Sequence, residues 1–467
     1  MEHKLEHWTV ELFSRIDIEE PMLGHLERFK EKLKTINKLN KLIKKIMQSN
    51  KISHINKMNT SFKLFIMSIA FCFNLAINIS THKLFAQKQN IVELTKKMDI
   101  PVIELKGDAY ARGLQHGTQL KNEINDVFMK WKLNIKKTIK SNPDSLLTTF
   151  LKASNFKPTI LKHTPELMDE LKGIADGSGQ SFDDVFAFQL VDEFWVYLDK
   201  QLNIKNHHCS SLGVASTKNH PAYIAQNVDL ETYMNNYQVL LHINATKNEP
   251  EQYILSCAGL IGINGANESG IGVCVNTLME LQASSDGLPV AFIIRALLKI
   301  KDGEDVLEFI KNVKHASGQN YILGIIDNIY DFEASANQVV RFIPEKGKDD
   351  IVYHTNHALV NHDVKEWYKE YHQRILFGKT KSRNTQVRYA SLENRLNFQP
   401  ENVSLDVIKM ALKSKDDKLN PVCIPFDEKG GGFTFSSVVF TLGNKRSVQL
   451  TYGSPDQSEY HEYFFKH

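Results

Sequence analysis

The pattern of hydrophobic and polar positions changes twice along the chain. Up to residue 57 the sequence is rich in Lys, Glu and Leu, and residues 24–33 carry apolar side chains at i, i+3 and i+4, which predicts helix. Residues 64–79 form an almost continuous apolar run. From about residue 100, short β-rich segments and amphipathic segments follow one another, which predicts a large globular domain.

The order of predicted elements in that domain indicates its fold class. Residues 101–107 predict a strand and 108–131 an amphipathic helix, and helices continue to about residue 200. Strands dominate after Ser211. Predicted strands cover 223–227, 237–243, 253–256, 272–276, 321–326, 339–343, 351–354, 433–442 and 448–452, and predicted helices follow Pro289 and occupy 363–413. Runs of helices and runs of strands in this order favour an α+β layered fold over an alternating βαβ fold.

Residues 58–86 have the order of a secretory signal. Lys63 precedes the apolar run, and Ala86 supplies a small residue at a cleavage point. The run has about 16 residues, fewer than the roughly 20 of a spanning helix. We expect a signal peptide from Met58 or a signal-anchor, with a buried helix as the alternative, and residues 1–57 as a helical extension or an over-extended start. The large globular domain is then exported, periplasmic or extracellular, either released or held at the inner membrane through this segment alone.

Composition excludes several classes of function. The 467 residues carry a net charge of +3, which gives no general affinity for nucleic acid. The five cysteines are widely spaced and form no C-x-x-C pair, so we expect neither a zinc ribbon nor a disulfide scaffold. No phosphate-binding loop, zinc-protease or dinucleotide motif occurs, and we expect no metal and no cofactor. Cys257 and Cys274 lie in apolar strands and should be buried, whereas polar residues surround Cys209.

Several segments together resemble one family. Residues 103–117 contain R-G-x-Q-H-G, from Arg112 to Gly117, and residues 264–276 contain G-x-N-x-x-G-I followed by Asn276. Four further segments match in order, at 287–295, 316–321, 332–335 and 354–357. In these motifs, from about residue 100 to the C-terminus, the chain resembles the isopenicillin N acyltransferase-like family of cysteine autoproteolytic hydrolases.

This resemblance implies a four-layer αββα N-terminal-nucleophile fold over residues 95–467. It also implies that the precursor cuts itself between His208 and Cys209, which gives an α chain to residue 208 and a β chain from residue 209. Cys209 would then be the nucleophile, and its own α-amine, with a reference pKa of roughly 8, would serve as the general base. A hairpin between about residues 209 and 229 would return Asp229 to the side of Cys209.

The resemblance assigns further roles by position. Asp229 would orient the Cys209 amine, while Asn276 and Asn356 would donate hydrogen bonds to the oxyanion. Arg383 would place a positive charge near the acyl oxygen, with Arg388 as the competing candidate for that role. Ser211 would assist self-cleavage, Asn227 would contact the substrate's leaving group, and His116 would be structural. These assignments complete the predicted site.

The sequence therefore predicts a self-cleaving cysteine amidohydrolase or acyltransferase that acts on a small N-acyl substrate through an S-acyl-Cys209 thioester. Two alternatives stay open: a lipid or ceramide-type acyl hydrolase on the same fold, and a catalytically silent binding protein of the envelope. The two chains of the precursor are the only protein partners that the sequence implies. It leaves the acyl group, the acceptor and the oligomeric state open.

Overall fold

The structure is a computed structural model that describes residues 99–202, 208–344, 350–376 and 384–466. These residues belong to a compact unit that runs from Gln89 to His467. The helical extension predicted for residues 1–57 and the signal predicted for 58–86 lie outside the described residues and stay predictions. Among the described residues, no helix is both long and apolar enough to cross a membrane.

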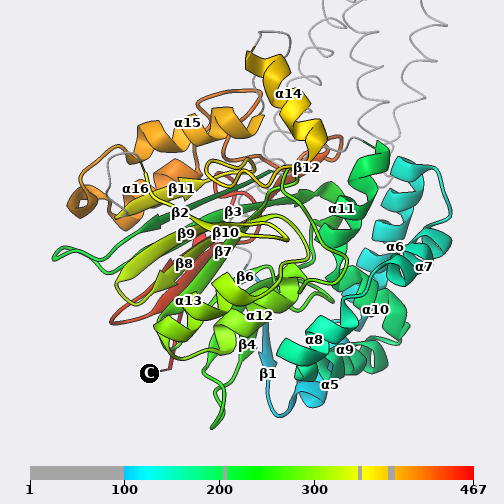
Figure 1. The fold of residues 1–467 in the computed structure, drawn as a ribbon. Helices are drawn as coiled ribbons and strands as arrows, with labels where there is room; N and C mark the ends of the chain where they lie inside the picture. Colours follow the sequence, from blue (N-terminus) through cyan, green and yellow to red (C-terminus); the bar gives the residue numbers. More distant parts are fainter. Residues whose placement is uncertain (1–98, 203–207, 345–349, 377–383, 467) are drawn as a thin grey trace, which may run out of the picture. The chain divides into compact units, whose positions relative to one another are not determined.

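Two sheets form the centre of the unit (Figure 1). The first has eight strands, and only its first pair, β1 with β4, is parallel. Its order is β1 (Val102–Leu105), β4 (Gln238–Ile243), β5 (Gln252–Cys257), β6 (Asn264–Asn267), β7 (Ile271–Thr277), β8 (Gln319–Ile325), β9 (Asn328–Ala334) and β10 (Val339–Phe342). β4 to β9 are buried over most of their length because both faces of this sheet are covered.

The second sheet has six strands and is antiparallel throughout. Its order is β11 (Ile351–His354), β2 (His208–Val214), β3 (Tyr223–Glu231), β12 (Gly432–Thr441), β13 (Ser447–Thr451) and β14 (Tyr460–Phe464). Apolar side chains of the two sheets share one buried cluster, in which Ile224 and Phe440 of this sheet join Val273 and Ile322 of the other. The sheets therefore pack face to face.

Helices cover both outer faces of the two packed sheets. On the eight-stranded sheet lie α12 (Val290–Lys299) and α13 (Gly303–Asn312), with residues 290–298 of α12 buried. On the six-stranded sheet, α15 (Asn384–Leu396) and α16 (Leu405–Leu412) share a second buried cluster with Leu212 and Ala225. The order helix, sheet, sheet, helix confirms the predicted four-layer αββα fold (Figure 1).

The remaining described α-helices come mainly before β2. They are α5 (Ala109–Gln119), α6 (Lys121–Ile139), α7 (Pro143–Ala153), α8 (Lys157–His163), α9 (Pro165–Ser178), α10 (Phe182–Gln189), α11 (Val191–Leu202) and, after β11, α14 (Glu366–Leu376). The single helix predicted over 108–131 was wrong, because Leu120 leaves helical geometry (φ −110°, ψ 25°) and separates α5 from α6. β14 was missed, since its alternately exposed residues YHEYF carry a weak strand signal.

The R-G-x-Q-H-G motif holds α5 against α9. A Cβ atom added at Gly113 would lie 1.9 Å from the carbonyl oxygen of Glu170, so the two helices can cross this closely only with glycine there. His116 is fully buried, and its Nε2 accepts a hydrogen bond from Gly259 N–H at 3.0 Å. His116 therefore has the structural role that was expected for it.

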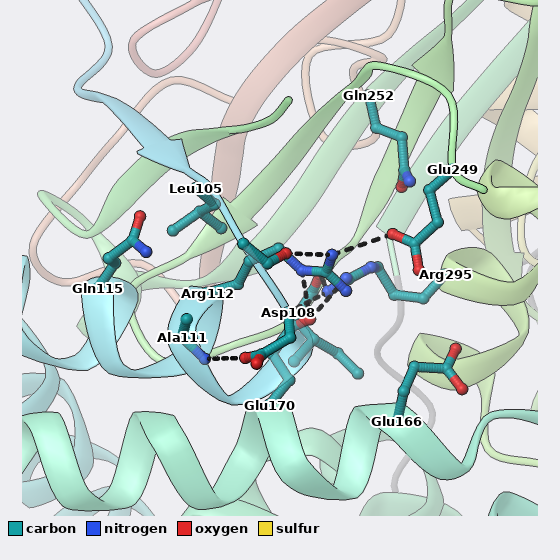
Figure 2. Close-up of polar contacts among 12 residues, drawn as sticks. Leu105, Asp108, Ala111, Arg112, Gln115, Glu166, Glu170, Glu249, Gln252 and Arg295 are labelled. Carbon is teal, nitrogen blue, oxygen red and sulfur yellow. Dashed lines mark hydrogen bonds and ion pairs between the residues drawn. The ribbon is translucent and has the colours of Figure 1, made fainter. Parts of the chain in front are cut away.

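Arg112 of the same motif belongs to a buried ion cluster (Figure 2). Its Nε lies 3.4 Å from Glu170, its Nη1 lies 3.0 Å from Glu249, and Arg295 forms a bidentate pair with Glu170 at 2.5 and 2.8 Å. Burial alone would raise the pKa of Glu170, but the guanidinium groups of Arg295 and Arg112 outweigh it and hold that pKa below its usual value. One carboxylate thus links α5, α9 and α12.

Replacing Glu170 with Gln should strongly destabilise the fold, because it leaves two buried guanidinium groups short of a counter-charge. We expect the free energy of unfolding to fall by about 3–5 kcal/mol, as for other broken buried pairs. Urea unfolding measures the change. Glu166→Gln is the control, since the Glu166–Lys299 pair is partly exposed, and its loss should cost less than about 1 kcal/mol. Equal losses in both variants would contradict this account of the cluster.

Candidate active site

Cys209 lies near the start of β2 and is partly exposed. β2 pairs antiparallel with β3, with Cys209 opposite Val228 and His208 opposite Asp229. The predicted hairpin is confirmed, and it brings Asp229 back to the candidate nucleophile.

Both backbone polar groups of Cys209 are held by buried side chains. Its N–H donates to Oδ1 of Asn356 at 2.6 Å, and its carbonyl oxygen accepts from Nη1 of Arg388 at 2.5 Å. Arg388 is fully buried and also donates to Ser210 Oγ at 2.8 Å and to Asn356 Oδ1 at 2.9 Å. The peptide nitrogen of the His208–Cys209 bond is therefore fixed in place.

The two asparagines predicted for the oxyanion lie on this same site. Nδ2 of Asn276, at the end of β7, donates to Ser211 Oγ at 2.5 Å. Nδ2 of Asn356 donates to the carbonyl oxygen of Thr277 at 3.0 Å. The structure thus brings together Cys209, Ser211, Asn276 and Asn356 from the two sheets and the segment after β11. In the uncut chain Asn356 also accepts the Cys209 N–H, a contact that the sequence did not predict.

Asp229 is buried, and one of its two carboxyl oxygens accepts a side-chain hydrogen bond. Its Oδ1 accepts from Thr434 Oγ1 at 2.6 Å, across the β3–β12 pairing, whereas its Oδ2 has no hydrogen-bond partner among the described residues. Burial raises the pKa of Asp229 to about 7, although Arg388 and the Thr434 hydroxyl oppose the rise. Near neutral pH this carboxyl group can therefore give or take a proton.

The thiol is not activated in the uncut chain. Burial, reinforced by the negative charge of Asp229, raises the pKa of Cys209 to about 12, against the opposing effects of the Asp229 N–H and Arg388. A thiol with this pKa is almost fully protonated at neutral pH, and the thiolate is the reactive form. A base or a new positive charge beside the sulfur is therefore needed before it reacts.

Two predicted site residues are placed elsewhere or not described. The buried amide of Asn227 donates to the carbonyl oxygens of Leu412 at 2.8 Å and Val422 at 3.0 Å, so it binds the backbone of the C-terminal segment. Arg383 lies outside the described residues. Among the described residues, Arg388, the competing candidate, is the arginine whose contact with Cys209 is seen.

Sequence reasoning missed three residues that support the site, namely Ser210, Asn384 and Thr434. Nε of Arg388 donates to Asn384 Oδ1 at 2.6 Å, one helical turn earlier in α15. That i, i+4 spacing is a signal in the sequence. The contact of Thr434 with Asp229 depends on a strand pairing across about 200 residues, which no local pattern reveals.

A sequence model of one family matches residues 215–457, more than half of the chain. Its description is "Acyl-coenzyme A:6-aminopenicillanic acid acyl-transferase". The chain belongs to this family. The matched segment begins directly after β2 and includes Asp229, Asn276, Asn356 and Arg388. The position of Cys209 therefore rests on the geometry described above.

Two curated relatives of this family member come from Dictyostelium discoideum. Protein dcd1B is 25% identical over 223 residues, which cover 43% of this chain and 43% of the relative. Protein dcd1A is 24% identical over 242 residues, which cover 44% of this chain and 51% of the relative. The chain spans about half or less of the length of the curated relatives that it matches.

Solved structures with some likeness to the chain include three hydrolases. The N-acylethanolamine-hydrolyzing acid amidase ortholog of Caenorhabditis elegans has a TM-score of 0.34 and 14% identity, over 50% of this chain and 92% of that chain. A mutant of conjugated bile acid hydrolase from Clostridium perfringens has a TM-score of 0.35 and 13% identity, over 55% and 97%. Penicillin V acylase from Agrobacterium tumefaciens has a TM-score of 0.31 and 12% identity, over 52% and 82%.

The two candidate arginines can be separated by conservative substitution. Arg388→Lys should slow the expected cut before Cys209 at least about tenfold, because one ammonium group cannot reproduce the several directed contacts of a guanidinium group. Arg383→Lys should leave the rate within about twofold. Denaturing electrophoresis of freshly expressed protein measures the cut fraction over time. A slow Arg383→Lys variant beside a normal Arg388→Lys variant would contradict the assignment to Arg388.

Proposed function

We propose that the protein is a self-cleaving cysteine amidohydrolase or acyltransferase of the N-terminal-nucleophile type, which acts on an N-acyl amide through an S-acyl-Cys209 thioester. The observation that carries the proposal is the fixation of the Cys209 backbone, with its N–H on Asn356 and its carbonyl on Arg388, beside the buried carboxyl group of Asp229. Membership of an acyl-transferase family supports the reaction class.

The first reaction would be the cut of the chain itself. The Cys209 sulfur adds to the carbonyl carbon of His208, a C–S bond forms, and the C–N bond breaks. Asp229 takes the thiol proton and passes it to the departing nitrogen, for which its partnerless Oδ2 and its pKa of about 7 are suited. Water then hydrolyses the thioester, which leaves a carboxylate on His208 and restores the thiol of Cys209 beside a new α-amine.

The new amine would change the chemistry of the thiol. A chain-terminal amine has a reference pKa of roughly 8, so a neutral fraction that can accept the thiol proton exists near pH 7. Asn356 Oδ1 already accepts the hydrogen on this nitrogen in the uncut chain. Asn356 and Asp229 would therefore keep the amine oriented toward the sulfur after the cut.

The acyl substrate would react through the same steps as the His208–Cys209 peptide bond. The thiolate adds to the substrate carbonyl, and Asn276 donates a hydrogen bond to the oxyanion. One such donor is worth on the order of 3 kcal/mol. The amine leaves with the proton that the Cys209 amine carries, and the S-acyl enzyme then reacts with water or with an acceptor amine. Export of the protein, which we also propose, would favour water.

Substituting Cys209 tests the cut. The wild-type protein should give two fragments on denaturing electrophoresis, with Cys209 as the first residue of the second fragment. Cys209→Ala should stay a single chain and show no acyl transfer or amide hydrolysis, because the nucleophile of both reactions is gone. Cys423→Ala is the matched control and should cut normally. An active wild-type protein that stays uncut would overturn the proposal, and a cut protein without acyl chemistry would favour the silent binding protein.

The pH dependence of the cut tests the role of Asp229. Its ionised form is the base, and its pKa is raised to about 7. The rate of cutting should therefore rise as pH increases through about 7 and then level off. Asp229→Asn should cut at least about 100-fold more slowly, since general-base catalysis is worth about 10²–10⁴-fold, and should lose this rise. Time courses on refolded precursor between pH 5 and 9 measure it. An unchanged profile in Asp229→Asn would contradict the assignment.

A further inference from the structure

The amide of Asn276 is held from the side opposite the nucleophile. Its Nδ2 makes two contacts, one to Ser211 Oγ at 2.5 Å and one to Oδ1 of Asn320 at 2.9 Å. Asn320 lies directly opposite Asn276 in the pairing of β7 with β8, and both residues are fully buried. Asn320 therefore takes one of the two amide hydrogens and leaves the other directed toward Ser211 and the nucleophile strand.

The orientation of Asn320 is fixed in turn by acceptors. Its Nδ2 donates to a carboxylate oxygen of Asp331 and to the carbonyl oxygen of Phe332 at 3.3 Å. A carbonyl oxygen can only accept, so the amide nitrogen of Asn320 must face β9 and its oxygen must face Asn276. If Asn320 turned over, two oxygen atoms would meet at Phe332, and two amide NH₂ groups would meet at Asn276.

Asp331 belongs to a buried charged group behind the site. It is fully buried, and the imidazole of His354 and the carboxylate of Glu333 both act on it electrostatically. His354 pairs with Glu333 at 2.9 Å, and Glu333 also accepts the backbone N–H groups of residues 359–361. Asp331 thus lies near His354 and Glu333, which are held by hydrogen bonds of their own, and it gives Asn320 a fixed acceptor.

Asn276 needs this help because nothing else among the described residues fixes its amide. Its Oδ1 is buried and has no hydrogen-bond partner there, and the Ser211 hydroxyl can either donate or accept. Without Asn320 the amide of Asn276 could turn by about 180° and present its oxygen to the position where the oxyanion forms. Two oxygen atoms there would repel each other instead of forming a hydrogen bond.

We propose that Asn320, held by Asp331, is a positioning residue that directs one amide hydrogen of Asn276 to the oxyanion. The inference rests on the proposed function, since it assumes that an acyl oxyanion forms beside Cys209. It adds a residue pair from β8 and β9 whose hydrogen bonds in the described structure go to Asn276 and to β9, not to Cys209. Asn320 acts only through Asn276, and this separates it from a residue that merely stabilises the sheet.

A double-mutant cycle tests the inference on the mature enzyme. The probe is 4-nitrophenyl acetate, with release of nitrophenolate giving the acylation rate and mass spectrometry locating the acetyl group on Cys209. Asn276→Ala should slow acylation by about 10²–10³-fold, as expected for an oxyanion donor. Asn320→Leu should slow it about 10–100-fold with the half-saturating concentration within about twofold. The double variant should be no slower than Asn276→Ala, because the second change has nothing left to misdirect.

Two further variants separate a loss of stability from a loss of the orientation of Asn276. Asn267→Leu removes a buried amide at the end of β6, whose oxygen accepts the N–H of Ile271 at the start of β7, so it should lower stability without slowing acylation. The exchange Asn320→Asp with Asp331→Asn restores a donor toward residue 320 and an acceptor toward Asn276. It should recover the rate to within about threefold of wild type, and it decides the matter if Asn320→Leu does not fold.

The outcomes separate the inference from the proposed function. Three results would overturn the inference while Cys209 is still acetylated. The effects of Asn320→Leu and Asn276→Ala could multiply, or Asn320→Leu could leave the rate unchanged. The exchange variant could also fold and be as slow as Asn320→Leu. Absence of acetyl-Cys209 in the wild-type protein would overturn the proposed function, and the inference with it.

Discussion

Arg388 is the group on which the candidate site depends most. A buried guanidinium group is costly unless its hydrogen bonds are made. Here four oxygen atoms accept from it, on Cys209, Ser210, Asn356 and Asn384. One cation therefore ties the nucleophile strand to the segment after β11 and to helix α15. It also lowers the pKa of Asp229 and of the Cys209 thiol relative to burial alone.

The packing of two sheets explains why so many buried polar groups can meet at one point. The six-stranded sheet supplies Cys209 and Asp229, and the eight-stranded sheet supplies Asn276 with Asn320 behind it. Strand pairing satisfies most of the backbone within each sheet, and buried side chains bond to one another and to the strand-end groups of Cys209 and Thr277. Among the described residues, Oδ2 of Asp229 and Oδ1 of Asn276 are buried without a hydrogen-bond partner. The first of them is the proton acceptor that the proposed chemistry needs.

The sequence predicted the parts of this arrangement that are local. The strand and helix patterns predicted the layered fold, and the short span between Cys209 and Asp229 predicted their hairpin. The family motifs predicted that Asn276 and Asn356 belong to the site. What it could not give are contacts set by distant pairing: Thr434 on Asp229, and Asn320 on Asn276. The break at Leu120 was also missed, because the apolar periodicity continues across it while the backbone does not. For Asn227, the resemblance implied contact with the substrate's leaving group, yet its side-chain amide donates to two backbone carbonyl oxygens.

Cutting the chain is expected to turn an inert thiol into a nucleophile. The most direct measurement is the pH dependence of Cys209 alkylation by iodoacetamide in the cut protein, followed by mass spectrometry of the new N-terminal peptide. We expect alkylation to rise with pH with an inflection several pH units below the pKa of about 12 that burial gives the thiol in the uncut chain. A cut protein whose Cys209 still reacts only near pH 12, while the enzyme turns over substrate at neutral pH, would contradict it.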